Sequence, residues 1–178
     1  MTGLDASPAL VAAAREADPA GSYVVGAAEA LPFENARFDL VVTYNCLMDV
    51  DDMPTAVGEI ARVLRQDGRF CACVLHPTAD AGRFEPAGDD WVFVISEPYL
   101  EERDYELVSD RDGIRFAFRS RRYPLESYAR ALEGAGLLIE SLREPMVTGP
   151  GRTGQPPDRW DRLPMFLHFR AVKGDSSR

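Results

Sequence analysis

Four polar residues of this 178-residue chain follow short apolar runs, at positions where side chains can bind a ligand or move a proton. Asp5 follows the first run, Tyr44 and Asn45 follow a second, and His76 follows a third. Apolar runs of this length predict buried strands. Open α/β folds bind ligands at the carboxyl ends of their parallel strands, so we expect these side chains to share one edge of a sheet. A carboxylate there accepts hydrogen bonds from hydroxyl groups, and an imidazole exchanges a proton near neutral pH.

The elements that must position these residues alternate between strand and helix over the first 75 residues. Ser7 followed by Pro8 predicts a capped helix start, and Gly68 predicts the end of a helix that begins at Met53. Helices are expected at residues 8–17 and from Met53 to Gly68, and strands at 22–26, 38–43 and 69–75. This alternation predicts a mostly parallel sheet that is covered on both faces by helices.

The pattern changes between residues 77 and 122. Apolar runs there flank a polar turn signal, Asp110 to Gly113, and predict an antiparallel hairpin. We interpret residues 77–122 as an insertion that covers the substrate. A helix around 125–132, a strand at 137–144, a Gly- and Pro-rich mobile loop at 145–161 and a last strand at 163–172 are expected to follow. The prediction is one α/β domain, residues 1–174, with a disordered tail at 175–178.

Composition narrows the classes of partner. A formal charge of −9 argues against nucleic acid or an anionic membrane, which would both repel the chain. No window has the roughly 18 apolar residues of a membrane span, and no secretory signal opens the chain, so we expect a cytoplasmic protein. Cys71 and Cys73 are predicted to share one face of a strand, as buried apolar residues rather than metal ligands.

Four segments in order carry a resemblance to a known family. They are Gly3-Leu4-Asp5-Ala6-Ser7-Pro8, Glu29-Ala30-Leu31-Pro32-Phe33, Arg37-Phe38-Asp39-Leu40-Val41-Val42, and Glu59-Ile60-Ala61-Arg62-Val63-Leu64-Arg65 with Asp67-Gly68-Arg69. The chain resembles the class I S-adenosylmethionine-dependent methyltransferases, and within them the small-molecule enzymes of the type 11 domain group. The resemblance covers residues 3–75, and residues 128–145 are similar to the family's late helix and strand. It implies a Rossmann-like sheet with an antiparallel last strand, S-adenosylmethionine as cofactor and a small organic methyl acceptor.

The resemblance also implies roles around the cofactor. Asp5, with Ala6 beside it, would accept hydrogen bonds from the ribose hydroxyls, although a charge at a helix N-terminus is the alternative. The loop holding Ala28, Glu29 and Leu31 would bind the adenine ring, or the loop is an ordinary turn packed on the core. This sequence departs from the family at residue 27, where alanine replaces an aspartate that accepts a hydrogen bond from adenine.

The residues after the second apolar run are assigned to the methionine end of the cofactor, and the residue after the third run is assigned to the methyl acceptor. Tyr44 and Asn45 would line the methionine end. Methyl transfer is largely a matter of alignment, and a base matters only where the nucleophile must lose a proton. His76 is the candidate for that base or for orienting the substrate, and a hydrogen-bonded structural histidine is the alternative. Arg119, Arg121 and Arg122 are interpreted as part of a solvated strand face rather than an anion site.

The start of the chain carries an expectation of its own. The family has a first strand and a glycine-rich turn before the segment that begins at Gly3, and no G-x-G-x-G sequence is present. The fold is therefore predicted to be N-terminally truncated, with two unpaired inner strand edges open to self-association. The glycine-rich half of the cofactor site is then expected to be missing, which leaves open whether this chain is active as a methyltransferase. A shortened reading frame is favoured over a deliberate fragment or a natural protein that pairs with another chain. The alternative function is a non-catalytic, protein-binding remnant of the fold, and a nicotinamide dehydrogenase is a weaker third possibility.

Overall fold

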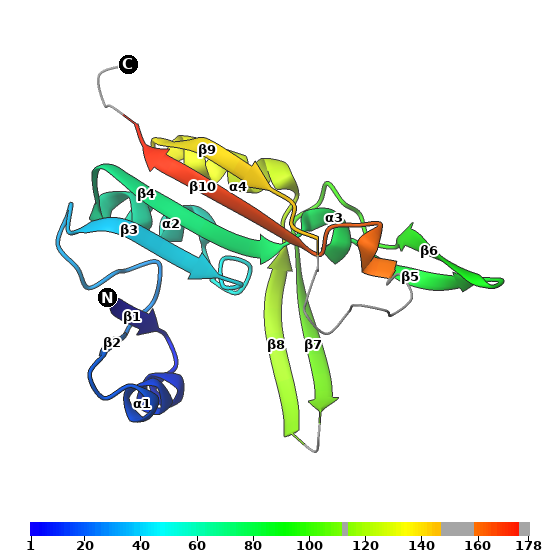
Figure 1. The fold of residues 1–178 in the computed structure, drawn as a ribbon, viewed down its shortest axis with the longest axis horizontal. Helices are drawn as coiled ribbons and strands as arrows, with labels where there is room; N and C mark the ends of the chain where they lie inside the picture. Colours follow the sequence, from blue (N-terminus) through cyan, green and yellow to red (C-terminus); the bar gives the residue numbers. More distant parts are fainter. Residues whose placement is uncertain (112–113, 147–158, 175–178) are drawn as a thin grey trace.

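The computed structural model of the protein describes residues 1–111, 114–146 and 159–174. The strands are β1 (Thr2–Asp5), β2 (Ser22–Val25), β3 (Phe38–Tyr44), β4 (Leu64–Leu75), β5 (Gly82–Ala87), β6 (Asp90–Ile95), β7 (Arg103–Arg111), β8 (Ile114–Arg122), β9 (Leu137–Arg143) and β10 (Phe166–Lys173). The helices are α1 (Pro8–Ala17), α2 (Met53–Val63), α3 (Pro77–Asp80) and α4 (Leu125–Gly134), with a 3-10 turn η1 (Arg159–Asp161). Figure 1 shows a central sheet from which two hairpins project beyond the end of β4.

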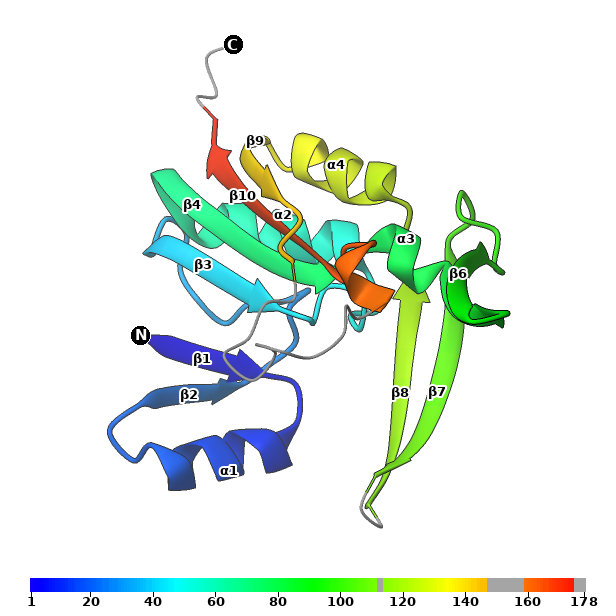
Figure 2. The ribbon, with the colours of Figure 1, turned by 45° about the vertical axis from the view of Figure 1, so that its right-hand side comes forward.

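The first three elements form a parallel βαβ unit. β1 pairs with β2 in parallel, from Thr2 opposite Ser22 to Asp5 opposite Val25. Helix α1 begins at Pro8 because the Ser7 hydroxyl accepts a hydrogen bond from the backbone N–H of Leu10, 3.3 Å away. The predicted bounds 8–17 are therefore confirmed. Figures 1 and 2 place this unit on the β3 side of the central sheet, with β1 running in the same direction as β3.

The central sheet has the strand order β3-β4-β10-β9. β3 and β4 are parallel, and β10 is antiparallel to both β4 and β9. This order places the last strand of the chain between two strands that precede it in sequence. The predicted α/β class and the antiparallel last strand are confirmed.

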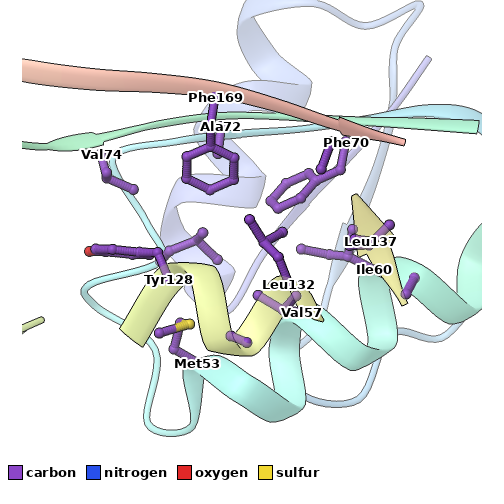
Figure 3. Close-up of a cluster of buried hydrophobic side chains, with 14 of the residues drawn as sticks. Met53, Val57, Ile60, Phe70, Ala72, Val74, Tyr128, Leu132, Leu137 and Phe169 are labelled. Carbon is purple, nitrogen blue, oxygen red and sulfur yellow. The ribbon is translucent and has the colours of Figure 1, made fainter. Parts of the chain in front are cut away.

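Helices α2 and α4 cover one face of this sheet, and the core lies between them and the strands (Figure 3). Phe70 of β4 and Phe169 of β10 meet there edge to face, with ring centroids 5.7 Å apart. Leu132 of α4 and Val57 of α2 pack against the same cluster. Each large apolar side chain buried in this way contributes about 1.5–3 kcal/mol to folding.

The opposite face of β3 is open. Leu40, Val42 and Tyr44 alternate along the strand on that face, and they are 53%, 63% and 70% exposed. Helix α1 packs against β1 and β2 and not against this strand. The expectation that helices cover both faces is therefore wrong for β3 within the described part of the chain.

The predicted role of Gly68 is also wrong. Helix α2 ends at Val63 and β4 begins at Leu64, so the glycine lies within a strand. The ladder between β3 and β4 is irregular here, with Asp67 at a φ of 60°. A Cβ atom on Gly68 would lie 2.8 Å from the carbonyl oxygen of Arg65. The position requires glycine because the backbone approaches itself closely, and not because a helix stops there.

The predicted antiparallel insertion is two hairpins, β5–β6 and β7–β8. Three other predictions concern residues outside the described part of the chain: the hairpin turn at 112–113, most of the Gly- and Pro-rich loop, at 147–158, and the tail at 175–178. Among the described helices, none is long and apolar enough to span a membrane.

Candidate cofactor site

Asp5 lies at the carboxyl end of β1 with an exposed side chain. Its Oδ1 accepts a hydrogen bond from the backbone N–H of Ser7 at 2.8 Å, and its carbonyl oxygen accepts one from Gly26 at 3.0 Å. The turn that follows Ala6 is thereby fixed and leads directly into α1. Within the described residues no partner engages Oδ2, so the carboxylate keeps acceptor capacity toward solvent.

The loop from Gly26 to Arg37 follows β2 and contains the three residues predicted to bind adenine. Ala28 is half-buried, and Leu31 packs against the hydrophobic core. The Glu29 carboxylate accepts a hydrogen bond from the backbone N–H of Asp51 at 2.8 Å. The Glu29 side chain therefore ties this loop to the one after β3.

Tyr44 and Asn45 lie where β3 ends, as predicted. Tyr44 is on the open face of the sheet. Asn45 has a φ of 47°, a left-handed conformation that asparagine tolerates better than most residues. Its backbone N–H donates to the carbonyl oxygen of Cys73 at 2.8 Å, and its Oδ1 accepts from the Cys73 thiol at 3.6 Å. The chain therefore turns sharply away from β4 at this residue.

The Cys46 thiol is partly buried and is influenced by nearby carboxylates. Burial raises the pKa of its thiol to about 11, and the carboxylates of Asp49 and Asp5 add to the rise. Asp5 thus acts electrostatically on the residue that follows Asn45. Figure 2 shows the carboxyl ends of β1 and β3 pointing in the same direction.

His76 follows β4 and caps helix α3. Its Nδ1 accepts a hydrogen bond from the backbone N–H of Thr78 at 3.2 Å, and its Nε2 lies 2.9 Å from a carboxylate oxygen of Glu144. The backbone N–H of His76 donates to the carbonyl oxygen of Met165 at 2.9 Å. With Nδ1 accepting, the proton is assigned to Nε2, where it is donated to Glu144. Both ring nitrogens are engaged, and the geometry favours a positioning role.

A polar network beneath the β7–β8 hairpin was not predicted. The Ser120 hydroxyl donates to the Asp49 carboxylate, and Tyr105 hydrogen-bonds to both Ser120 and Asp80. The guanidinium of Arg122 lies 4.3 Å from the centre of the Tyr105 ring and 3.7 Å from the Asp80 carboxylate. The interpretation of Arg122 as part of a solvated face is therefore wrong. Its partners lie on other elements, which sequence spacing does not reveal.

Asp80 makes this network sensitive to pH. Burial raises the pKa of its carboxyl above the ordinary value of 3.8, although Arg122 and Tyr105 both act to lower it. Because the folded-state pKa is the higher one, ionised Asp80 disfavours folding at pH above that value and has no effect below the unfolded value.

We expect Asp80→Asn to raise the midpoint of thermal unfolding at pH 7, because the variant removes a buried charge. The difference from the wild-type protein should disappear as the pH falls below about 4. Thermal unfolding followed by circular dichroism between pH 3.5 and 8 measures both values. A lower midpoint for Asp80→Asn at pH 7 would show that the ion pair with Arg122 outweighs the cost of burial.

Two cavities flank the carboxyl end of the central sheet. One, of about 210 Å³, is polar and lies between the loop after β3 and the β7–β8 hairpin; it is lined by Met48, Asp49, Val50, Asp51, Asp104, Arg119, Ser120 and Arg121. The other, of about 360 Å³, is mostly apolar and is lined by Leu75, Ala79, Gly82, Arg83, Phe84, Trp160 and Met165. No three His, Cys, Asp or Glu side chains of the described segments gather as a metal site would require.

Comparison with known proteins gives this arrangement a family context. A profile of the family described as "Methyltransferase domain" matches residues 1–72. Malonyl-[acyl-carrier protein] O-methyltransferase of Serratia marcescens is 30% identical over 181 residues, which cover 95% of this chain and 69% of that protein. Ubiquinone/menaquinone biosynthesis C-methyltransferase UbiE of Dinoroseobacter shibae is 31% identical over 117 residues, which cover 65% of this chain and 45% of that protein.

Solved structures show the same fold. An S-adenosylmethionine-dependent methyltransferase from Mesorhizobium loti superposes with a TM-score of 0.78 at 26% identity, covering 96% of this chain and 79% of that one. A second, from Listeria monocytogenes, gives a TM-score of 0.76 at 22% identity and covers 98% of this chain and 79% of that one.

Proposed function

The chain belongs to the class I S-adenosylmethionine-dependent methyltransferases, and we propose that it transfers a methyl group from S-adenosylmethionine to a small organic molecule. The family, the Rossmann-like fold and the cofactor agree with the predictions from sequence. The proposal goes no further than a small acceptor, because the two relatives named above are an O-methyltransferase and a C-methyltransferase.

The observation that supports this proposal most directly is the exposed Asp5 carboxylate at the carboxyl end of β1. The Asp5 carboxylate is exposed, has acceptor capacity left on Oδ2 and acts electrostatically on Cys46. A carboxylate at the end of a parallel strand suits the two neighbouring hydroxyl groups of a ribose. The residues present therefore fit an adenosine-bearing cofactor.

The other predicted residues complete the proposed site. Ala28 and Glu29 offer the backbone of the loop after β2 to the adenine ring, and Leu31 offers its apolar side chain. Tyr44 and Asn45 are at the end of β3, where the methionine part of the cofactor would be held. When bound, S-adenosylmethionine supplies a methyl group on a positively charged sulfur, so these residues need only align the acceptor and exclude water.

We assign His76 a positioning role within this proposal. Its bond to Thr78 holds the start of α3, and its contact with Glu144 links the end of β4 to the segment that follows β9. The larger cavity, which Leu75, Ala79 and Met165 help to line, lies beside the segments that these contacts fix. The acceptor would therefore enter a site whose walls are held by the His76 contacts, without proton transfer through the ring.

Calorimetric titration of S-adenosylhomocysteine, the product form of the cofactor, into the 178-residue protein tests the proposal. Binding with a stoichiometry of one is the expected result. Titration of NAD under the same conditions is the control for a general affinity of the fold for adenine-containing ligands. Heat from NAD alone, or from neither compound, would overturn the proposal.

Self-association belongs to the same proposal. Among the described strands, β1 pairs only with β2, and β3 pairs only with β4, so one edge of each has unpaired backbone groups. We expect the mass measured by light scattering to rise above 19.7 kDa as the concentration increases. A constant monomer mass up to high concentration would contradict this expectation.

No observation favours the non-catalytic alternative, and the cytoplasmic location stays a prediction.

A further inference from the structure

Two side chains of α2 hold the loop after β2 from below. The Glu59 carboxylate accepts the backbone N–H of Leu31 at 2.8 Å, and the Arg62 guanidinium donates to the carbonyl oxygen of the same residue at 2.9 Å. Both hydrogen-bonding groups of Leu31 are therefore engaged by one pair of side chains. We propose that Glu59 and Arg62 are positioning residues that hold this loop in the conformation that binds the adenine part of the cofactor.

The Arg62 contacts extend over the second half of the loop. Its Nη1 donates to the carbonyl oxygen of Phe33 and to the side-chain oxygen of Asn35, each at 2.8 Å. The backbone of the same residue accepts from Ala36 at 3.0 Å. One arginine thus contacts four residues of a segment that has no helix or strand of its own. A planar guanidinium with five donors is suited to this task, and lysine is not.

The pair is also held together internally. Arg62 Nε lies 2.6 Å from Glu59 Oε1, and Nη2 lies 2.8 Å from Oε2, which is a two-point ion pair. This contact lowers the pKa of Glu59 below its ordinary value, so the carboxylate stays ionised at neutral pH. The side chains are only 31% and 21% exposed for Arg62 and Glu59. The ion pair therefore fixes the orientation of both side chains toward the loop.

The function of the pair goes beyond a stabilising helix contact. A glutamate and an arginine three residues apart on a helix usually form a solvated ion pair worth a few tenths of a kcal/mol. Here the same spacing directs both side chains onto the backbone of a loop 28 to 31 residues earlier in the chain. A loop that is competent to bind for only a fraction of the time raises the apparent dissociation constant by the inverse of that fraction.

The test compares two helix ion pairs. Arg62→Ala should raise the dissociation constant for S-adenosylhomocysteine about tenfold, if release leaves the loop competent for about a tenth of the time. Arg62→Lys should restore little of the loss, because lysine cannot bridge several acceptors at once. Arg130→Ala is the matched control, because Arg130 pairs with Glu126 on α4 at 2.6 Å and contacts no loop among the described residues. It should leave the dissociation constant unchanged.

Hydrogen exchange gives a second measurement that needs no ligand. The amides of residues 28–36 should exchange faster in Arg62→Ala than in the wild-type protein, while those of β4 should not change. Unchanged exchange in the loop would overturn the proposal, whatever the measured affinity for S-adenosylhomocysteine.

The cofactor role of the pair rests on the proposed function, and the outcomes of the binding experiment separate the two. If the wild-type protein fails to bind S-adenosylhomocysteine, the proposed function and the cofactor role of the pair are both wrong. If the wild-type protein binds it and Arg62→Ala binds it equally well, only the role of the pair is wrong.

Discussion

Replacing Asp5 with alanine should weaken binding of S-adenosylhomocysteine by roughly 100-fold. A hydrogen bond to a charged group contributes about 1.5–3 kcal/mol, and the loss of two such bonds to neighbouring hydroxyl groups amounts to about 3 kcal/mol or more. The carboxylate is exposed at the end of β1, so its removal leaves no buried polar group unpaired other than the Ser7 N–H, which can reach water. Calorimetric titration of the wild-type and variant proteins measures the effect.

Two further variants separate binding from local structure. Asp5→Asn keeps an oxygen for the Ser7 N–H but removes the charge, so it should lose about half of the binding free energy that Asp5→Ala loses. Asp39→Ala removes an exposed carboxylate of β3 that pairs with Arg65 at 2.7 Å, away from the proposed site. It should bind as the wild-type protein does. An affinity for Asp5→Ala within twofold of the wild-type value would show that Asp5 only terminates β1 and starts α1.

The sequence allowed those parts of the fold to be predicted that depend on neighbouring residues. Ser7 and Pro8 define the start of α1 through contacts within three residues, and the predicted bounds hold. The order of strands and helices up to residue 75 followed from periodicity and from start and stop signals. The end of α2 could not be predicted in the same way, because Gly68 is explained by the close approach of the Arg65 carbonyl oxygen within an irregular strand.

The candidate site shows the same division. The carboxyl-end positions of Asp5, Asn45 and His76 were predictable, because each residue ends a strand or directly follows one. Their partners were not. His76 contacts Glu144 across 68 residues, and Asp49 contacts Ser120 across 71. Such contacts depend on which strands become neighbours in the fold, and the spacing of residues in the sequence does not indicate the strand order.

The Glu59–Arg62 pair lies between these two cases. Both residues belong to a segment that was recognised from sequence, and residues three apart lie on a common side of a helix. What the spacing left open was the target, since a solvated ion pair and a support for the loop at Leu31 have the same sequence pattern. The structure is therefore needed to decide between these two roles for a glutamate and an arginine three residues apart.

The largest loss of stability should follow from Phe70→Ala. Phe70 is completely buried at the centre of β4 and meets Phe169 edge to face. Figure 3 shows it pointing from the sheet toward the helices, among the side chains of the core. Truncating a buried phenylalanine costs about 3–5 kcal/mol, because the transfer free energy is lost and a cavity remains. Urea unfolding followed by circular dichroism measures the change in the free energy of unfolding.

Val42→Ala is the matched control for the two faces of the sheet. Val42 lies on the neighbouring strand β3 but on the open face, and it is 63% exposed. Its truncation should cost about 0.5 kcal/mol or less, as expected for a surface position. A cost close to that of Phe70→Ala would show that the open face of β3 is covered in solution. Equal small costs for both variants would contradict the placement of the core between β4 and the helices α2 and α4.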